Sequence, residues 1–135
     1  DVSARERLSS LLIFAGGDKE AEMEIVKTVT EEMETYRESL NKYLPAAEKE
    51  KEAQEDNTQA VQVELSQEDK QNVSRIAHKL QPIAQMMQAE CQQQLLALSP
   101  EHISEQEDKK IRAYIQAVFD DLGNMLGELR NILSE

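Results

Sequence analysis

At the centre of the chain lies the run Arg75-Ile76-Ala77-His78-Lys79-Leu80-Gln81-Pro82. Around it, apolar residues recur at alternating spacings of three and four, at Val73, Ile76, Leu80, Ile83 and Met87. At about 100° per residue these positions share one helix face, which indicates an amphipathic helix packed into a core. Ser66 followed by Asp69 resembles a capping box and marks the start of that helix. The pattern therefore predicts a helix over residues 66–87.

His78 lies about 160° from the middle of this apolar stripe, so we expect it to face water. We expect the same face to carry Gln71, Ser74, Arg75, Gln81, Pro82 and Gln85. No Asp or Glu occurs between Gln71 and Ala89, which favours a neutral imidazole near pH 7. The ring of Pro82 crowds the carbonyl of His78 and predicts a kink or a loosened turn there. The competing interpretation is an ordinary surface histidine on a bent core helix.

The composition points to one helical domain. The 135 residues include only 4 Gly and 3 Pro, and 31% are charged. The formal net charge of −12 argues against nucleic acid or an anionic membrane surface as the main partner. We find no apolar run of membrane-spanning length and no signal peptide. The chain begins at Asp1 without a methionine, which predicts a piece of a longer protein. The lone Cys91 excludes an intramolecular disulfide, and we expect it to be a small buried residue.

Further helices are predicted on both sides of the central one. A short leading helix ends at Gly16-Gly17, because glycine readily takes the left-handed conformation past a helix end. Asp18 is a predicted N-cap for the next helix. The polar stretch over 45–65 has no sustained apolar stripe and is interpreted as an insertion. Together with the C-terminal part of the chain, the predicted helices span residues 3–15, 18–44, 66–87, 89–98 and 104–134.

The C-terminal helix carries the longest apolar stripe, at Ile111, Ile115, Val118, Leu122, Met125, Leu129 and Ile132. Ser104 and Glu107 are predicted to form its capping box. Gly123 and Gly127 lie four residues apart beside the stripe and indicate a close helix contact. The whole chain, residues 1–135, is therefore predicted to be an all-α single domain, an antiparallel up-down four-helix bundle with a short leading helix.

Few residues offer chemistry. The sequence has no phosphate-binding glycine loop, no Cys/His metal spacing and no Ser/His/Asp set that spacing can assemble. His102 follows Glu101 in a connection and is interpreted as a surface residue. His78 remains, and a lone imidazole needs no cofactor to accept a group on nitrogen and release it again.

The segment Ala77-His78-Lys79-Leu80 resembles the phosphoacceptor helix of histidine-containing phosphotransfer (HPt) domains. Upstream, the segment Phe14-Ala15-Gly16-Gly17-Asp18-Lys19-Glu20 resembles the turn between the first two helices of that family. The resemblance implies that His78 exchanges a phosphoryl group with the aspartate of a response-regulator receiver domain. It implies a phosphocarrier without kinase activity of its own, in the cytoplasmic part of a hybrid sensor histidine kinase. It also implies that Mg²⁺ is held by the receiver and that this chain needs no cofactor or metal and makes no membrane contact.

Two positions depart from the family pattern. Gln81 replaces its lysine and Pro82 replaces its glycine, although Arg75 and Lys79 supply positive charge nearby. Gln92, Gln93 and Gln94 are alternative candidates for a glutamine contacting the imidazole. The predicted receiver-binding residues are Gln71, Ser74, Arg75, Lys79, Gln81, Pro82 and Gln85. Two alternatives stay open: a pseudo-phosphotransfer module that docks a receiver without accepting phosphate, and a helical dimerisation or scaffold domain.

Overall fold

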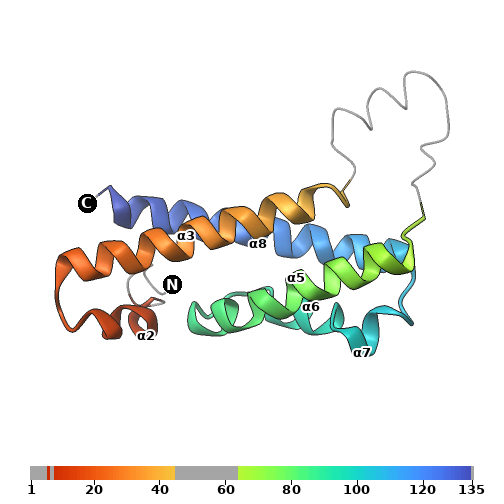
Figure 1. The fold of residues 1–135 in the computed structure, drawn as a ribbon, viewed down its shortest axis with the longest axis horizontal. Coiled ribbons are helices and arrows are strands. Elements are labelled where there is room, and N and C mark those ends of the chain that lie inside the picture. The colour runs from red at the N-terminus through yellow and green to blue at the C-terminus, as the bar shows by residue number, and fades with distance from the viewer. Residues whose placement is uncertain (1–5, 7, 45–63, 135) are drawn as a thin grey trace, which may run out of the picture.

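The computed structural model describes residue 6, residues 8–44 and residues 64–134. Within them every regular element is helical, as predicted. Figure 1 shows the elements in chain order: α2 (Ser9–Leu12), the 3-10 helix η1 (Ile13–Ala15), α3 (Lys19–Asn41), α5 (Gln67–Met86), α6 (Gln92–Ala97), α7 (Pro100–Ile103) and α8 (Asp108–Leu133). Of the predicted insertion, residues 45–63 lie outside the described residues, as do residues 3–5 and 7 of the predicted leading helix.

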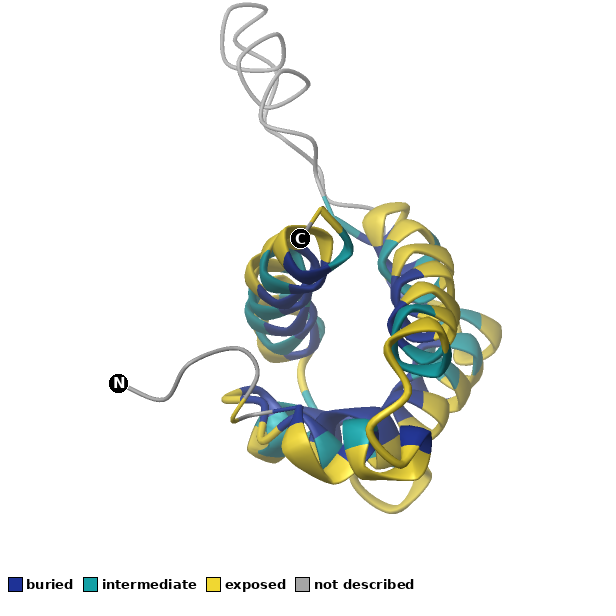
Figure 2. Ribbon diagram, turned by 90° about the vertical axis from the view of Figure 1, so that its left-hand side faces the viewer, coloured by how far each residue is buried: buried dark blue, intermediate teal, exposed yellow. Residues whose placement is uncertain are grey.

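The long helices pack side by side. α3 lies along α8 and also contacts α5, while α6 packs against both α5 and α8. Figure 1 shows that α3 and α8 run in opposite directions, and that α5 runs back toward the end where α3 begins. The buried residues of these helices face one shared interior (Figure 2). One hydrophobic core therefore joins all the long helices.

The core contains the apolar stripes that the sequence predicts. All seven stripe residues of α8 are buried, from Ile111 to Ile132. In and just after α5, Val73, Leu80, Ile83 and Met87 are buried, and Ile76 packs against them half-buried. Cys91 is also buried, which confirms its predicted place in the interior. Burying such side chains stabilises the fold by about 25 cal/mol for each Å² of apolar surface removed from water.

Most of the predicted helix ends are confirmed. Ser66 and Asp69 form the full capping box at the start of α5. Asp18 caps α3, its Oδ1 accepting the Glu20 amide at 2.9 Å. Gly16 and Gly17 follow η1 with φ of 62° and 86°, the left-handed conformation that glycine tolerates best. These contacts satisfy backbone groups that a helix end would otherwise leave without partners.

Two predicted helix starts are wrong. The last long helix begins at Asp108, because Pro100 starts the separate short helix α7, which ends at Ile103. Ser104 therefore follows α7 as its C-cap, and Glu107 makes no side-chain cap, so the predicted capping box does not exist. The predicted helix over 89–98 is only α6, since the chain turns at positive φ at Gln88 first. The leading helix tightens to the 3-10 form at η1 before Gly16.

A polar bridge joins α3 to α8 at Gly123. The Nε of Arg37 donates to the Phe119 carbonyl at 2.9 Å, and its guanidinium lies 3.7 Å from the centroid of the Phe119 ring. A Cβ at Gly123 would lie 2.8 Å from Arg37 Nη2, whereas one at Gly127 would meet nothing within 4 Å. The predicted close helix contact is therefore confirmed at Gly123 and wrong at Gly127.

Candidate functional site

His78 lies near the middle of α5, and its side chain is exposed. Within the described residues, its imidazole makes no hydrogen bond or ion pair. α5 continues past Pro82 for a further turn, to Met86. Because proline has no N–H, the carbonyl of His78 lacks its usual donor four residues later. The structure thus places an imidazole with both ring nitrogens available on a turn with weakened backbone bonding.

The predicted receiver-binding residues do not all share the exposure of His78. Exposed residues are Gln71, Arg75, Lys79, Pro82 and Gln85, while Gln81 is half-buried. Ser74 is only 3% exposed, which corrects the prediction that it faces water. α7 packs against α5, and Ser74 lies on the wall of the groove between them. The periodicity of the sequence does not predict this burial, because the burial depends on where the short helix α7 packs.

A groove of about 400 Å³ runs between α5 and α7, beginning at His78. Predicted residues on its wall are Gln71, Ser74 and Arg75. Sequence reasoning missed the remaining lining residues, which are Gln67, Lys70, Pro100, Ile103 and Ser104. The available signal was Ser99-Pro100, a typical helix start, since Pro100 occupies the first turn of the helix that forms the opposite wall.

A second, smaller hollow lies between α5 and α6. Gln81 and Gln85 line it together with Gln92 and Leu96, around a volume of about 30 Å³. The side chain of Gln92 donates to the Ala89 carbonyl at 3.0 Å. Of the three glutamine candidates, Gln92 alone therefore lies beside predicted site residues. Between the described residues no hydrogen bond joins it to His78.

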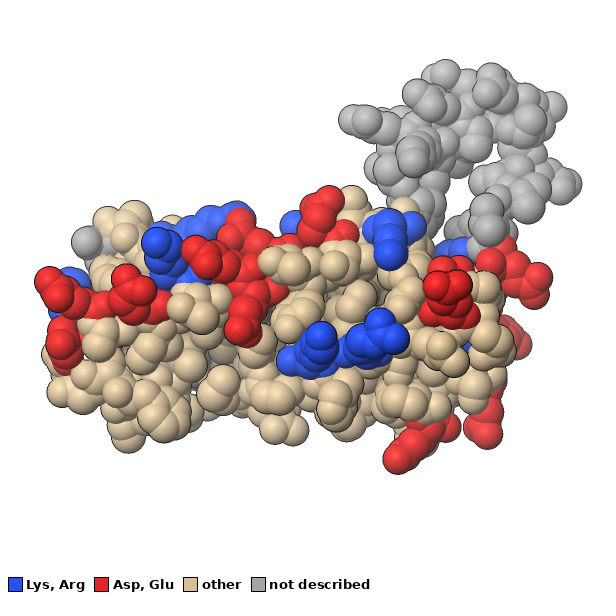
Figure 3. Space-filling model, viewed as in Figure 1, with Lys and Arg blue, Asp and Glu red and all other residues tan. Residues whose placement is uncertain are grey.

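The face of α5 that carries His78 is basic in an acidic protein. Lys70, Arg75 and Lys79 lie on this helix, and after Asp69 it contains no acidic residue. Figure 3 shows basic side chains gathered over α5 among uncharged surface. Arg75 donates to Asn72 on the same helix at 3.2 Å. Because the rest of the chain is strongly acidic, this patch is the natural place for an anionic group to approach.

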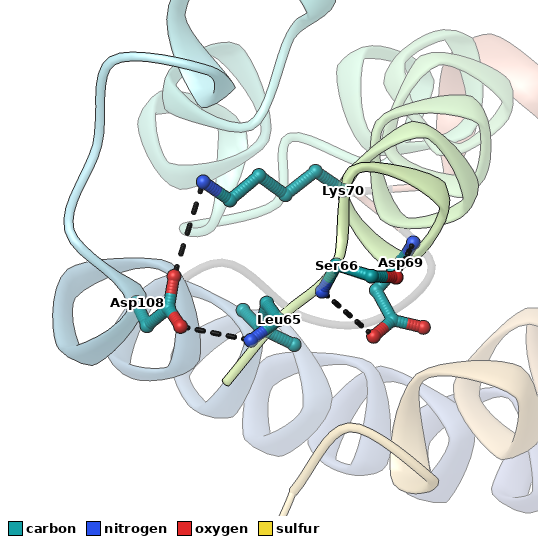
Figure 4. A network of polar contacts seen from close by, with 5 residues as sticks. All are labelled: Leu65, Ser66, Asp69, Lys70 and Asp108. Carbon is teal, nitrogen blue, oxygen red and sulfur yellow. Dashed lines mark hydrogen bonds and ion pairs between the residues drawn. The ribbon is translucent and has the colours of Figure 1, made fainter. Parts of the chain in front are cut away.

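Asp108 fixes the beginning of α5 against the beginning of α8 (Figure 4). Its Oδ2 accepts the Leu65 amide at 2.8 Å, and its Oδ1 lies 3.9 Å from Lys70 Nζ. Leu65 is buried and immediately precedes Ser66, the N-cap of α5. A single carboxylate thus holds both the backbone entering α5 and a basic side chain of the groove.

Other reactive groups lie away from this face. Burial and the neighbouring Asp121 raise the pKa of Cys91 to about 12, so its thiol stays protonated and unreactive near neutral pH. His102 is exposed on α7, as predicted. Among the described residues no cluster of three or more His, Cys, Asp or Glu is placed to hold a metal. None of the helices in the described part of the chain has both the length and the apolar character needed to cross a membrane.

Comparison with known proteins returns no match: no family model, no curated protein and no solved structure is similar enough to assign this chain to a family.

Proposed function

We propose that the chain is a phosphotransfer domain in which His78 accepts a phosphoryl group from a receiver aspartate and passes one on. The observation that carries this proposal is an exposed imidazole, without a partner among the described residues, on the basic face of α5 in an otherwise acidic chain. A lone histidine in this setting suits nucleophilic transfer, which needs one accessible nitrogen and nearby positive charge.

The proposed fold is an antiparallel up-down four-helix bundle formed by α3, α5, α6 and α8, with α2 and η1 leading into it. Its support is the set of packed pairs, α3 with α8 and α5 with α6, closed by α3 with α5 and α6 with α8. Such a bundle presents α5 as a rigid support, because Ala77 and Leu80 on either side of His78 are buried in the core.

In the proposed reaction a ring nitrogen of His78 attacks the phosphorus of an aspartyl phosphate in line. The new N–P bond forms as the O–P bond to the aspartate breaks, and the receiver recovers its free carboxylate. The reverse step returns the group to an aspartate. Mg²⁺ would be held by the receiver, whose acidic site also neutralises the transferring group. The domain itself has no kinase activity and requires no cofactor in this scheme.

The proposed partners are a response-regulator receiver domain and a parent histidine kinase, with the domain on the cytoplasmic side. The docking face consists of the exposed α5 residues around His78, and the buried Ser74 is not part of it. We do not propose nucleic acid or direct membrane contact, because the net charge of −12 repels both phosphate backbones and anionic lipid.

The test is incubation with a phosphorylated receiver of the same signalling system, followed by an assay for acid-labile, alkali-stable phosphate on this chain. Label that disappears in His78→Gln supports the proposal, and His102→Gln is the matched control that should keep the label. The competing function is docking without transfer, and it is favoured by Gln81 and Pro82 at the two altered family positions. Receiver binding without label, in wild type and His78→Gln alike, would establish that alternative.

A further inference from the structure

Ser74 has a buried hydroxyl without a partner. Its side chain is 3% exposed, yet Oγ has no hydrogen-bond partner among the described residues. Buried polar atoms in folded proteins are nearly always hydrogen-bonded, so one that is not calls for an explanation. Ser74 lies on the wall of the groove between α5 and α7. A ligand atom in that groove would supply the missing partner once the Ser74 side chain rotates toward it.

Helix geometry directs His78 toward the same place. His78 follows Ser74 by four residues and Arg75 by three, the two spacings at which helix side chains are neighbours. Side chains on a helix tilt toward its N-terminus, so the imidazole leans over the turn that contains Ser74 and Arg75. All three residues line the one groove. A group attached to the imidazole is therefore carried toward the mouth of this groove.

The groove is also suited to an anion. Its lining includes the cations Lys70 and Arg75, the amides of Gln67 and Gln71, and no carboxylate. Asp108 lies 3.9 Å from Lys70 Nζ, whereas the hydrogen bond given for the Arg75 side chain goes to the neutral Asn72. A volume of about 400 Å³ has room for a phosphoryl group and several waters, each of which takes about 30 Å³ in the liquid.

We infer that this groove is the binding pocket for the phosphoryl group carried on His78, with the Ser74 hydroxyl and the Arg75 guanidinium donating hydrogen bonds to its oxygens. The inference rests on the proposed function and deepens it. It distinguishes the two nearby cations: Arg75 lines the groove, whereas Lys79 does not. It also accounts for the absence of the family's lysine at position 81. Arg75, about one turn before His78, supplies the positive charge that Gln81 lacks.

The pocket can be tested without any receiver. Phosphoramidate phosphorylates histidine directly: a ring nitrogen forms the new N–P bond, the P–N bond of the reagent breaks, and its nitrogen leaves as ammonia. After removal of the reagent, ³¹P NMR follows hydrolysis of the phosphohistidines in the full chain. His102, exposed on α7 outside the lining of the groove, is an internal reference within the same sample.

Phosphohistidine should live longer at His78 than at His102. A phosphoryl group held in the groove by hydrogen bonds is less accessible to the attacking water than one on an exposed histidine, so its hydrolysis is slower. We expect Ser74→Ala and Arg75→Gln each to shorten the lifetime at His78 about two- to tenfold, the equivalent of one hydrogen bond. Lys79→Gln removes the same charge from the same helix outside the groove, and we expect it to have no such effect.

Ser74→Ala has a second expected signature. Removing a buried hydroxyl that lacks a partner should leave the unfolding midpoint of the unphosphorylated protein unchanged or raise it. A purely structural serine would instead lower the midpoint and leave the lifetime alone. If Ser74→Ala fails to fold, the lifetime of phosphohistidine at His78 in Arg75→Gln, a substitution at an exposed position, tests the pocket by itself.

Equal lifetimes at His78 and His102, or equal effects of Arg75→Gln and Lys79→Gln, would overturn the pocket. The proposed function fails separately: if phosphoramidate gives a long-lived phosphohistidine at His78 but no competent receiver labels it, the pocket stands and the relay does not.

Discussion

Asp108→Ala should unfold the protein at measurably lower urea concentration, because one carboxylate makes two contacts between distant segments. Its Oδ2 accepts the buried Leu65 amide at 2.8 Å, and its Oδ1 pairs with Lys70 at 3.9 Å. It also occupies the first turn of α8, where a negative charge favours the helix dipole. All three contributions disappear in the alanine variant.

The amide contact dominates the expected loss. A hydrogen bond to a charged group contributes about 1.5–3 kcal/mol, and here a partly buried donor is left without its acceptor. The ion pair adds less than about 1 kcal/mol, since it is long and its side chains are partly exposed to water. The dipole adds about 0.3–1 kcal/mol, and the better helix propensity of alanine offsets about 0.5 kcal/mol. We expect a free energy of unfolding lower by about 2–4 kcal/mol.

Urea denaturation followed by circular dichroism measures this loss, and the slope against urea should not change. Glu107→Ala is the matched control: it removes the adjacent acidic residue, which makes no side-chain cap, and should cost less than about 1 kcal/mol. Asp108→Asn keeps an acceptor oxygen and should fall between the two. A loss at Asp108→Ala no larger than at Glu107→Ala would refute the account of the Leu65 contact.

The other predictions concern the two glycines of α8 and the buried Cys91. Gly127→Ala should raise the free energy of unfolding by about 1 kcal/mol through helix propensity. At Gly123 the same gain should be offset by the displaced Arg37 contact, so that Gly123→Ala leaves the free energy of unfolding about unchanged in the same urea assay. Equal gains at both glycines would show that the Arg37 contact contributes nothing. The pKa of Cys91 rises from 9.0 to about 12 on folding, so between these values the native state binds more protons and stability should fall as pH rises. In Cys91→Ala this slope should be smaller, and an unchanged slope would contradict burial beside Asp121 as its cause.

The sequence is most informative where local pattern and tertiary packing agree. The stripes of α5 and α8 are buried as predicted, because apolar residues spaced three and four apart lie on a single face of a helix. The Ser66–Asp69 capping box is confirmed because all its atoms lie within one turn. The same signature fails at Ser104 and Glu107, where the preceding helix α7 already fixes the backbone of Ser104 in a helical conformation. An N-cap residue has an extended backbone conformation, and the sequence motif alone does not show that Ser104 lacks it.

The candidate site also has features that the sequence predicts and features that it does not. The exposure of His78 follows from its angle to the stripe, and the structure agrees. The burial of Ser74 does not follow from any angle, since it depends on α7, whose residues lie about 25 positions later in the chain. The groove and its cations Lys70 and Arg75 could likewise be found only after α7 was placed.

Two features of α5 act together at the proposed phosphoacceptor. Pro82 deprives the His78 carbonyl of its usual amide, and Ser74, one turn before, keeps a buried hydroxyl without a partner. Each costs stability when considered alone, because backbone and hydroxyl groups are normally bonded. An ordinary core helix would gain from alanine at both positions. Both occur within one turn of an exposed histidine, beside a groove lined by cations and no acid, which supports the proposed anion site at His78.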